Sequence, residues 1–369
     1  MLLGIDASRA VTNQRTGTEA YAYSLIQALI SLTAEKGHQL RLYYNQPPPP
    51  NLFPAASHVH DIVIPYPRLW THLRLAWELQ LHPPDCFFTP AHVIPLTYFG
   101  KSAATIHDLG YHYFPEAHTR RQVAYLEWST RHNGRRAEQI IADSQVTKDD
   151  LIKFYNLNPN KIEVVYPACD PALKPVTDKE QLTAVQQKYG IIAPYLLYIG
   201  TLQPRKNLVR LVEAYAAMPD HSHQLVLAGR TGWLAEPILK AIDALEPTVR
   251  RKIILPGYIE DGDKAALIYG ADVMLFPSLY EGFGFPVLEA NACGTAVICS
   301  NTSSLPEVAG EACLLVDPQN TAEITAAISR LLSDQSLQQA LIRKGLLNAE
   351  RFTWQKTAEQ VLSILEQVP

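Results

Sequence analysis

The sequence predicts an α/β protein made of two doubly wound, Rossmann-like domains. Its 369 residues suit two domains at about 150 residues each. Short apolar stretches rich in β-branched and aromatic residues alternate with longer stretches of helical periodicity. The alternation pauses once, near the middle of the chain, and then resumes. Because alternating strands and helices form parallel sheets covered on both faces, we expect two such sheets facing each other across a cleft.

The first half of the chain predicts a domain over residues 1–170. Helical spacing occurs over residues 18–36 and 119–138. Residues 46–50 contain four consecutive prolines, which fit neither a helix nor a central strand, so we expect an exposed loop there. The predicted strands are 2–5, 39–43, 62–64, 86–88, 103–106, 139–142 and 163–165.

Prolines at 167, 171 and 175 interrupt the pattern, and we interpret residues 171–190, with a polar helical stretch at 178–189, as a linker. A second domain follows over 191–350, with strands 195–199, 224–227, 253–255, 273–276, 296–299 and 314–316. Helical stretches lie at 208–217, 234–245, 263–269, 286–292 and 322–332. The last segment, 351–369, carries an apolar helical stripe, and we expect it to return to the first domain.

Composition excludes several classes of protein. Hydrophobic residues make up 47% and charged residues 18% of the chain, which is typical of a globular protein. The net charge of −4 provides no global basic field for nucleic acid. Five cysteines at unrelated spacings indicate free thiols in a reducing, cytoplasmic compartment. No apolar run reaches the roughly 18 residues of a membrane-spanning helix, and Asp6 interrupts the apolar N-terminus, which argues against a signal peptide.

The strongest functional signal is the segment 277–290, PSLYEGFGFPVLEA. It follows a predicted strand, and its glycines and Pro286 indicate a loop that leads into a helix. Free N–H groups at such a helix start bind anions, whereas the flanking Glu281 and Glu289 can accept hydrogen bonds from hydroxyl groups. A sugar nucleotide offers a diphosphate and hydroxyls at both ends. The alternative is a surface turn with incidental acids.

This segment, together with residues 303–318, 198–208 and the closing RFTW at 351–354, resembles the retaining glycosyltransferase family 4, whose members have the GT-B fold. The resemblance implies that Glu281 contacts hydroxyls of the transferred sugar and that Glu289 binds the ribose. It places Phe283, Gly284, Phe285 and Leu288 at the donor. The donor would be a nucleoside-diphosphate hexose of the UDP-glucose or GDP-mannose type, with no further cofactor.

The same resemblance implies a cationic clamp on the diphosphate, made by Lys206 and, in place of the more usual arginine after the strand-ending glycine, Arg205. Fixed cations stabilise the charge that develops on the leaving diphosphate. The alternative is a solvated turn. Tyr258 and Ile259 correspond to the position of the base, although ordinary loop packing explains their side chains equally well.

In the first domain, Gly17 corresponds to a glycine that faces the diphosphate, with a plain turn as the alternative. His107 resembles the family's histidine beside the donor sugar, and Asp108 either orients its ring or caps the next turn. We find no metal site: the Asp261-Gly262-Asp263 sequence is interpreted as an N-cap. Glu281 as a covalent nucleophile and front-face transfer are both chemically open, and the family's usual placement of this glutamate favours front-face transfer.

Fewer features of the sequence indicate the acceptor, which would be a saccharide or a lipid-linked sugar. Residues 66–77 place aromatic and basic side chains at helical spacing, and five arginines fall between Arg120 and Arg136. We favour a helix packing Trp70, Leu73 and Trp77 on the first sheet and a solvated arginine face. The alternative is peripheral contact with the inner face of a membrane. For the whole chain, the competing functions are a GT-B-fold epimerase or phosphorylase and a non-catalytic sugar-nucleotide-binding subunit.

Overall fold

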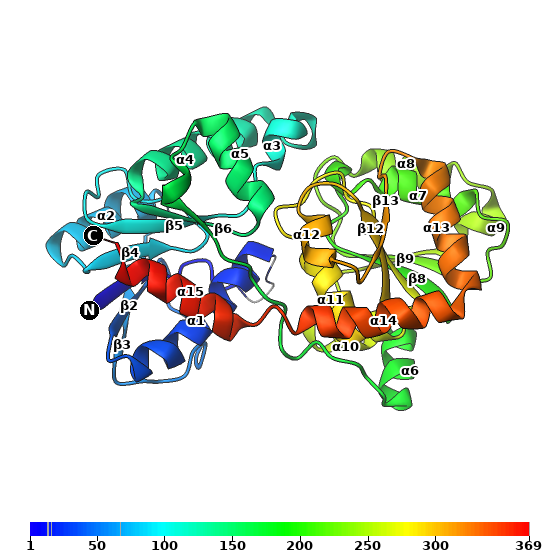
Figure 1. Ribbon diagram of the computed structural model, residues 1–369, viewed down its shortest axis with the longest axis horizontal. Coiled ribbons are helices and arrows are strands. Elements are labelled where there is room, and N and C mark those ends of the chain that lie inside the picture. Colours follow the sequence, from blue (N-terminus) through cyan, green and yellow to red (C-terminus); the bar gives the residue numbers. More distant parts are fainter. Residues whose placement is uncertain (13–14, 16, 67, 369) are drawn as a thin grey trace. The chain divides into compact units, whose positions relative to one another are not determined.

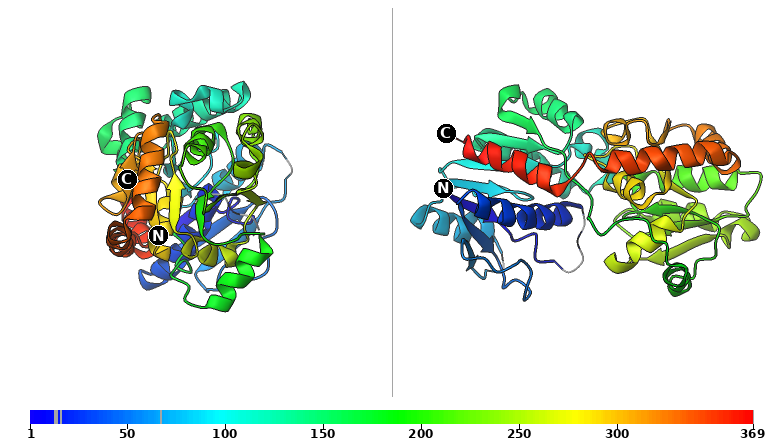
Figure 2. Two further views of the ribbon diagram at one scale, coloured as in Figure 1. Left: turned by 90° about the vertical axis from the view of Figure 1, so that its right-hand side faces the viewer. Right: turned by 60° about the horizontal axis from the view of Figure 1, so that its bottom comes forward.

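The computed structural model describes residues 1–12, 15, 17–66 and 68–368. The chain forms two compact units, shown in Figures 1 and 2. Unit 1 comprises Met1–Leu109, Arg120–Ala168 and Thr353–Pro369, and unit 2 comprises Gly110–Thr119 and Cys169–Phe352. Each unit contains one parallel sheet with helices around it, so the predicted α/β class is confirmed.

Unit 1 has a seven-stranded parallel sheet in the order β3-β2-β1-β4-β5-β6-β7. The order reverses direction between β1 and β4, and ligands of doubly wound sheets bind outside the carboxyl ends of strands at such a point. The central strands β4 and β5 are completely buried, as expected for a sheet covered on both faces. The strands are β1 (Leu2–Asp6), β2 (Gln39–Tyr44), β3 (Val59–Val63), β4 (Cys86–Thr89), β5 (Ser102–Ile106), β6 (Gln139–Ala142) and β7 (Ile162–Val164).

The helices of unit 1 include one that comes from the far end of the chain. Helix α15 packs along α1, as the right-hand view of Figure 2 shows. Here Tyr21 and Trp354 meet edge to face at 5.8 Å, and Thr357 Oγ1 donates a hydrogen bond to the Tyr166 carbonyl at 2.8 Å. The helices are α1 (Gly17–Glu35), a π-helical turn (Thr71–Leu75) that continues as α2 (Ala76–Leu81), α4 (Arg120–Arg136), α5 (Gln145–Tyr155), a 3-10 turn (Pro159–Lys161) and α15 (Trp354–Glu366).

Unit 2 has a six-stranded parallel sheet in the order β10-β9-β8-β11-β12-β13. Its strand order reverses between β8 and β11. All six strands were expected from their short apolar stretches. The four central strands are buried throughout, whereas the two edge strands are only partly buried. They are β8 (Tyr195–Ile199), β9 (Gln224–Ala228), β10 (Ile253–Gly257), β11 (Val273–Phe276), β12 (Ala296–Ser300) and β13 (Leu314–Val316).

The helices of unit 2 include α6, which lies within the stretch 171–190 that the sequence assigns to a linker. Helix α6 packs against α10, and the Lys188 ammonium contacts Asp263 Oδ2 at 2.6 Å. The helical elements are α3 (Gly110–Tyr113), a 3-10 turn (Pro115–Ala117), α6 (Lys179–Lys188), a 3-10 turn (Pro204–Lys206), α7 (Leu208–Ala216), α8 (Glu236–Asp243), α9 (Pro247–Arg250), α10 (Asp261–Tyr269), α11 (Phe285–Cys293), α12 (Leu305–Ala309), α13 (Thr321–Ser333) and α14 (Gln335–Ala349).

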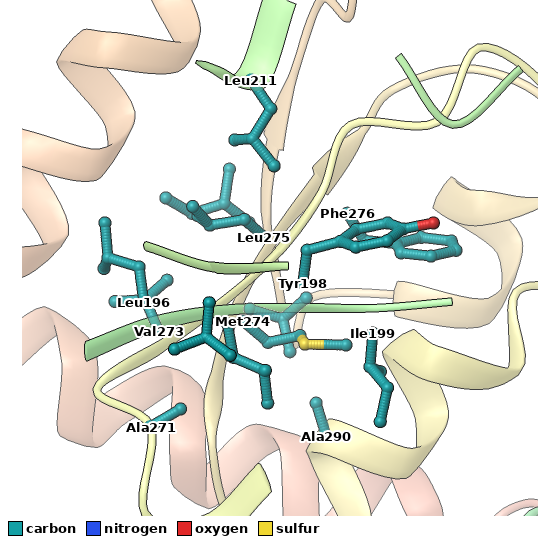
Figure 3. Packing of buried hydrophobic residues seen from close by; sticks show 14 of the residues in the cluster. Leu196, Tyr198, Ile199, Leu211, Ala271, Val273, Met274, Leu275, Phe276 and Ala290 are labelled. Atoms are coloured by element: carbon teal, nitrogen blue, oxygen red, sulfur yellow. The ribbon is translucent and has the colours of Figure 1, made fainter. Parts of the chain in front are cut away.

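The core of unit 2 forms around the neighbouring strands β8 and β11, whose residues are all buried. Figure 3 shows side chains of both strands packed together, with Tyr198 beside Phe276. These two rings stack with their centroids 6.1 Å apart, one residue from the end of β8 and at the last residue of β11. The loops that follow the two strands therefore start from a rigid, fully buried base.

Candidate active site

The candidate site of unit 2 begins at the carboxyl ends of β8 and β11, where the strand order reverses. The chain leaves β8 through Gly200, which has a φ of 149°. A Cβ on Gly229, at the end of the neighbouring strand β9, would lie 2.0 Å from the Gly200 carbonyl oxygen. Both strand ends thus need glycine to pass each other, and the loop after β8 can turn toward the loop after β11.

Asn207 fixes the turn that carries the two predicted cations. It has a left-handed backbone with a φ of 61° and follows the 3-10 turn Pro204–Lys206. Its buried amide donates to the carbonyls of Pro277 at 3.1 Å and Pro318 at 2.6 Å. The Leu279 amide in turn donates to the Arg205 carbonyl at 2.9 Å. Asn207 was not among the predicted site residues, although it directly follows the Pro-Arg-Lys sequence.

Arg205, Lys206 and Glu281 form a charge cluster at this position. Lys206 Nζ lies 2.6 Å from Glu281 Oε1, and Arg205 Nη1 lies 3.1 Å from Glu281 Oε2. Arg205 also donates to the Tyr280 carbonyl. The side chain of Lys206 is 11% exposed, that of Arg205 12% and that of Glu281 9%. Two cations therefore share one carboxylate, and the solvated-turn alternative for Arg205 and Lys206 is wrong.

The electrostatics of Glu281 follow from this arrangement. Burial alone would raise the pKa of Glu281, but the charges of Lys206 and Arg205 and the hydrogen bond from Lys206 lower it to about 2. The carboxylate is therefore ionised at any physiological pH. An ionised carboxylate acts only as a hydrogen-bond acceptor, which suits contact with hydroxyl groups.

Four hydroxyl-bearing residues at the end of β12 and directly after it hold the loop that contains Glu281. Ser304 Oγ donates to the carbonyls of Glu281 at 2.9 Å and Phe283 at 2.8 Å, and Ser303 Oγ accepts from the Glu281 amide at 3.0 Å. Ser300 and Thr302 donate to the carbonyls of Ser278 and Leu279. This support was not predicted as part of the site, because only the fold shows that the loops after β11 and β12 are neighbours.

Helix α11 starts directly after this loop. Gly284 precedes it with a φ of 111°, and a Cβ at this position would lie 2.6 Å from Leu305 Cδ2. Phe283 is buried against Phe285 and Phe352, with ring centroids 5.3 and 5.7 Å away. The Phe283 ring is therefore an anchor in the unit, and the backbone around Gly284 is the part suited to close approach of a ligand.

Glu289 lies on α11 and pairs with a residue that the sequence did not single out. Lys264 Nζ, on α10, lies 2.5 Å from Glu289 Oε1. Burial alone would lower the pKa of Lys264, but the Glu289 carboxylate raises it above its ordinary value. Leu288, the preceding residue on α11, is completely buried, so its side chain contributes packing.

The two residues predicted near the base differ in their surroundings. Arg230 stacks over the Tyr258 ring at 4.8 Å, and the Tyr258 hydroxyl donates to Asp261 Oδ1 at 3.4 Å. The Ile259 side chain belongs to the hydrophobic core of unit 2.

The Asp261-Gly262-Asp263 sequence does not cap a helix as predicted. Glu260 precedes α10 and makes no side-chain cap, whereas Asp263 accepts hydrogen bonds from Lys188 at 2.6 Å and Tyr189 at 2.8 Å. These partners come from α6, which the sequence pattern did not connect to this turn. Among the residues that the structure describes, no three His, Cys, Asp or Glu side chains form a group that could hold a metal ion.

His107 in unit 1 follows β5, and its ring is held from both sides. Nδ1 lies 2.6 Å from Asp143 Oδ2, and Nε2 lies 2.9 Å from the Pro90 carbonyl oxygen. Burial alone would lower the pKa of His107, but the Asp143 carboxylate and both hydrogen bonds raise it. The carboxylate bonded to the ring is Asp143, after β6, whereas the sequence left Asp108 either to orient the ring or to cap the next turn. Because both ring nitrogens face acceptors, this geometry favours the imidazolium form.

Two further expectations concern unit 1. Gly17 is the first residue of α1 and is exposed, so it lies at a helix N-terminus. The predicted packing of residues 66–77 is only partly right. Trp70 is buried, but Leu73 is 50% and Trp77 62% exposed, so the predicted apolar stripe does not pack on the sheet along its whole length. Along the described chain, no helix has the length and apolar character needed to cross a bilayer.

Comparison with known proteins finds family matches over both halves of the chain. Residues 185–348 match the family described as glycosyl transferases group 1, and residues 15–173 match glycosyltransferase family 4. The chain is 32% identical to the O-antigen chain mannosyltransferase B of Escherichia coli over 80% of this chain and 78% of that protein. It is 29% identical to the serotype-specific mannosyltransferase WbdA of Escherichia coli over 60% of this chain, but spans only 28% of WbdA.

Solved structures with this fold include sucrose-phosphate synthase from Thermosynechococcus elongatus, with a TM-score of 0.77 and 21% identity over 99% of this chain and 98% of that one. Anabaena HepE, solved in complex with UDP and glucose, has a TM-score of 0.74 and 16% identity over 99% of each chain. These likenesses show the GT-B architecture. With the family matches and the mannosyltransferase relative, they identify the chain as a glycosyltransferase that belongs to the group 1 family.

Proposed function

We propose that this glycosyltransferase moves a hexose from a nucleoside-diphosphate sugar to a saccharide or lipid-linked acceptor, with retention of configuration and without a metal ion. The observation that carries the proposal is the buried cluster of Arg205 and Lys206 around Glu281 at the strand-order reversal of unit 2. Two cations against one carboxylate leave a local positive charge, which suits a diphosphate.

The clamp acts on the leaving group. As the bond from the anomeric carbon to the diphosphate oxygen breaks, negative charge develops on that oxygen. Lys206 and Arg205 are already held in place by Glu281 and by the Tyr280 carbonyl, so they stabilise this charge with little reorganisation. The N-terminus of α11, after Gly284, adds the positive end of its dipole to the same task.

The remaining predicted residues have roles at the two ends of the donor. Glu281 accepts hydrogen bonds from the sugar hydroxyls, and Glu289 accepts those of the ribose. The backbone of Phe283, Gly284 and Phe285 follows the sugar and phosphates, and the backbone at Tyr258 and Ile259 seats the base. From unit 1 we propose His107 as a donor-sugar ligand, oriented by Asp143, and Gly17 as a diphosphate contact.

Retention is proposed to occur on one face of the sugar. The acceptor hydroxyl oxygen bonds to the anomeric carbon on the side from which the diphosphate leaves, and its proton passes to the departing phosphate oxygen. The low pKa of Glu281 and its two cationic partners support a hydrogen-bonding role over a nucleophilic one. A covalent glycosyl adduct on Glu281, detected by mass spectrometry, would overturn this part of the proposal.

For the transferred sugar we propose mannose, because a relative that is 32% identical over 80% of this chain is named a mannosyltransferase. Glucose is the second candidate, since a protein of the same fold was solved with UDP and glucose. We place the reaction in the cytoplasm, in keeping with free, mostly buried cysteine thiols, and at the inner face of a membrane when the acceptor is lipid-linked.

Hydrolysis and transfer with a panel of UDP- and GDP-hexoses test the function. We expect turnover of one donor, with GDP-mannose first, and a loss of at least about 100-fold in kcat/KM for Glu281→Ala. Glu311→Ala is the control, because Glu311 forms an exposed ion pair with Lys344. If no donor is bound or turned over, or if Glu281→Ala has no effect, the proposed function is wrong.

A further inference from the structure

One surface of unit 1 exposes large apolar side chains beside arginines. We call it the aromatic–basic face and define it by Trp77, Leu96, Phe99, Tyr125, Trp128 and Arg135. Phe99 is 81% exposed, Trp77 62%, Tyr125 48%, Leu96 45% and Trp128 38%. Isolated exposed hydrophobic residues are ordinary, but a gathering of them on one surface marks an interaction site.

Side-chain contacts join the three elements that carry this face. His72, in the turn before α2, meets the ring of Trp128 on α4 at 5.7 Å and accepts a hydrogen bond from the Leu96 amide at 3.4 Å. Gln80 on α2 donates to the Thr97 carbonyl at 2.8 Å. Arg136 lies 5.5 Å from the Phe99 ring and donates to the Tyr98 carbonyl at 2.7 Å. The residues of the face are therefore neighbours in unit 1, where Figure 1 labels α2 and α4.

Helix α4 contributes the charge. It contains five arginines and a single acid, Glu127, in a chain whose net charge is −4. Exposed residues recur along one side at 121, 124, 125, 128, 131 and 135, so three arginines and two aromatic rings share the same face. The opposite side, at Thr130, Asn133 and Gly134, is buried on the unit. A hollow of about 270 Å³ lies among Trp128, Arg131, His132, Arg135 and Arg136.

We propose that the aromatic–basic face docks on the surface of an anionic lipid bilayer. Aromatic rings partition to the interface between headgroups and hydrocarbon, and arginines are attracted by anionic headgroups. A helix that presents both on one side lies in the interface without crossing the membrane. The basic hollow beside Trp128 accommodates a headgroup phosphate. The inference deepens the proposed lipid-linked acceptor, but docking needs neither donor nor acceptor.

Vesicle flotation tests the docking separately from the reaction. Purified full-length protein is floated with phosphatidylcholine vesicles that contain or lack phosphatidylglycerol, at low and high salt, with no donor present. We expect flotation only with phosphatidylglycerol and a decrease as salt rises. Trp77→Ser/Phe99→Ser should lower the partition coefficient by more than about tenfold. Arg121→Glu/Arg135→Glu should lower it by at least about 25-fold, at about fivefold per arginine.

Matched variants on unit 2 serve as controls. Ile192→Ser/Leu347→Ser removes side chains that are 70% and 66% exposed, and Lys174→Glu/Lys179→Glu reverses two exposed lysines. Both should float like the wild type. Circular dichroism and hydrolysis of a soluble donor check that all variants are folded.

Two results would overturn the proposal. One is the absence of flotation with phosphatidylglycerol vesicles. The other is flotation that the face variants leave unchanged. If light scattering instead shows dimers that Trp77→Ser/Phe99→Ser dissociates and no flotation occurs, the face binds a second copy of the chain. A donor that is still turned over in these cases would leave the proposed function intact.

Discussion

Glu281 illustrates how much of the site is determined at the level of single residues. The sequence predicts Glu281, Lys206 and Arg205 as separate members of a site, and the structure brings all three into one buried cluster. The partners that the sequence missed, Asp143 for His107 and Lys264 for Glu289, lie 36 and 25 positions away along the chain. Their pairing depends on neighbouring strands and helices, which a local motif does not reveal.

Glu281 should give the protein an acid-sensitive component of stability. Its pKa in the folded state is about 2, below the ordinary value of 4.5, so the stabilising charge is complete above the unfolded pKa and is lost as the pH falls toward 2. This pH-dependent contribution to the free energy of unfolding is on the order of 3 kcal/mol. We expect it to be absent in Glu281→Gln. Urea unfolding at neutral and acidic pH measures it. An unchanged acid slope would contradict the assigned pKa.

Asp143 should set the protonation of His107. Because the Asp143 carboxylate raises the pKa of His107, we expect Asp143→Asn to lower it, and the basic limb of the kcat/KM profile should move to lower pH. NMR titration of the His107 ring protons measures the shift directly. Asp108→Asn is the control. It should shift the pKa of His107 less, because Asp143 is the carboxylate hydrogen-bonded to the ring. A larger shift in Asp108→Asn than in Asp143→Asn would contradict this assignment.

At the scale of elements, the sequence predicts strands better than helices. All thirteen strands form at or near their predicted positions, because most are short buried apolar runs between turns. The edge strand β3 has no buried residue, and it begins at Val59 rather than at the predicted residue 62. Helices α5 and α14 were not predicted, since their apolar periodicity is weak and their starts depend on caps. Ser144 accepts from the Thr147 amide, and Asp334 accepts from the Leu337 amide. The π-helical turn before α2 was also missed, and Trp77, expected to pack on the sheet, is exposed.

The start of α11 should be intolerant of a side chain at Gly284. Its φ of 111° and the 2.6 Å approach of Leu305 predict that Gly284→Ala destabilises the protein by about 2 kcal/mol or more. Gly262→Ala on α10 is the matched control, because a Cβ there meets no atom within 4 Å and alanine favours a helix. Urea unfolding compares the two. Equal stabilities would show that the α11 start is less constrained than the structure indicates.

At the scale of the whole molecule, the sequence predicts two parallel-sheet units, and each has its own buried core. The division into units does not follow the order of the sequence throughout, because residues 110–119 belong to unit 2 although they lie within the first half of the sequence. The proposed donor contacts at 200–207 and 277–289 lie in unit 2, after the ends of β8 and β11.

Hydrogen exchange of the whole chain should locate this binding. With saturating UDP or GDP we expect slower exchange of the amides at 200–207 and 277–285, because the ligand stabilises the loops that hold the charge cluster. The edge strand β3 of unit 1 and its neighbour β2 are the internal reference. Protection confined to unit 1 would place the nucleotide elsewhere.

The central claim is that the Lys206–Glu281 cluster forms the diphosphate site, and equilibrium titration with UDP and GDP tests it most directly. Lys206→Met/Glu281→Gln neutralises both charges together, so no unpaired carboxylate destabilises the fold. Lys188→Met/Asp263→Asn removes a surface ion pair with the same 2.6 Å distance. We predict that the wild type and the surface variant bind one nucleotide with equal affinity and that the cluster variant loses at least about tenfold. Equal binding by all three proteins would contradict the assignment of the site.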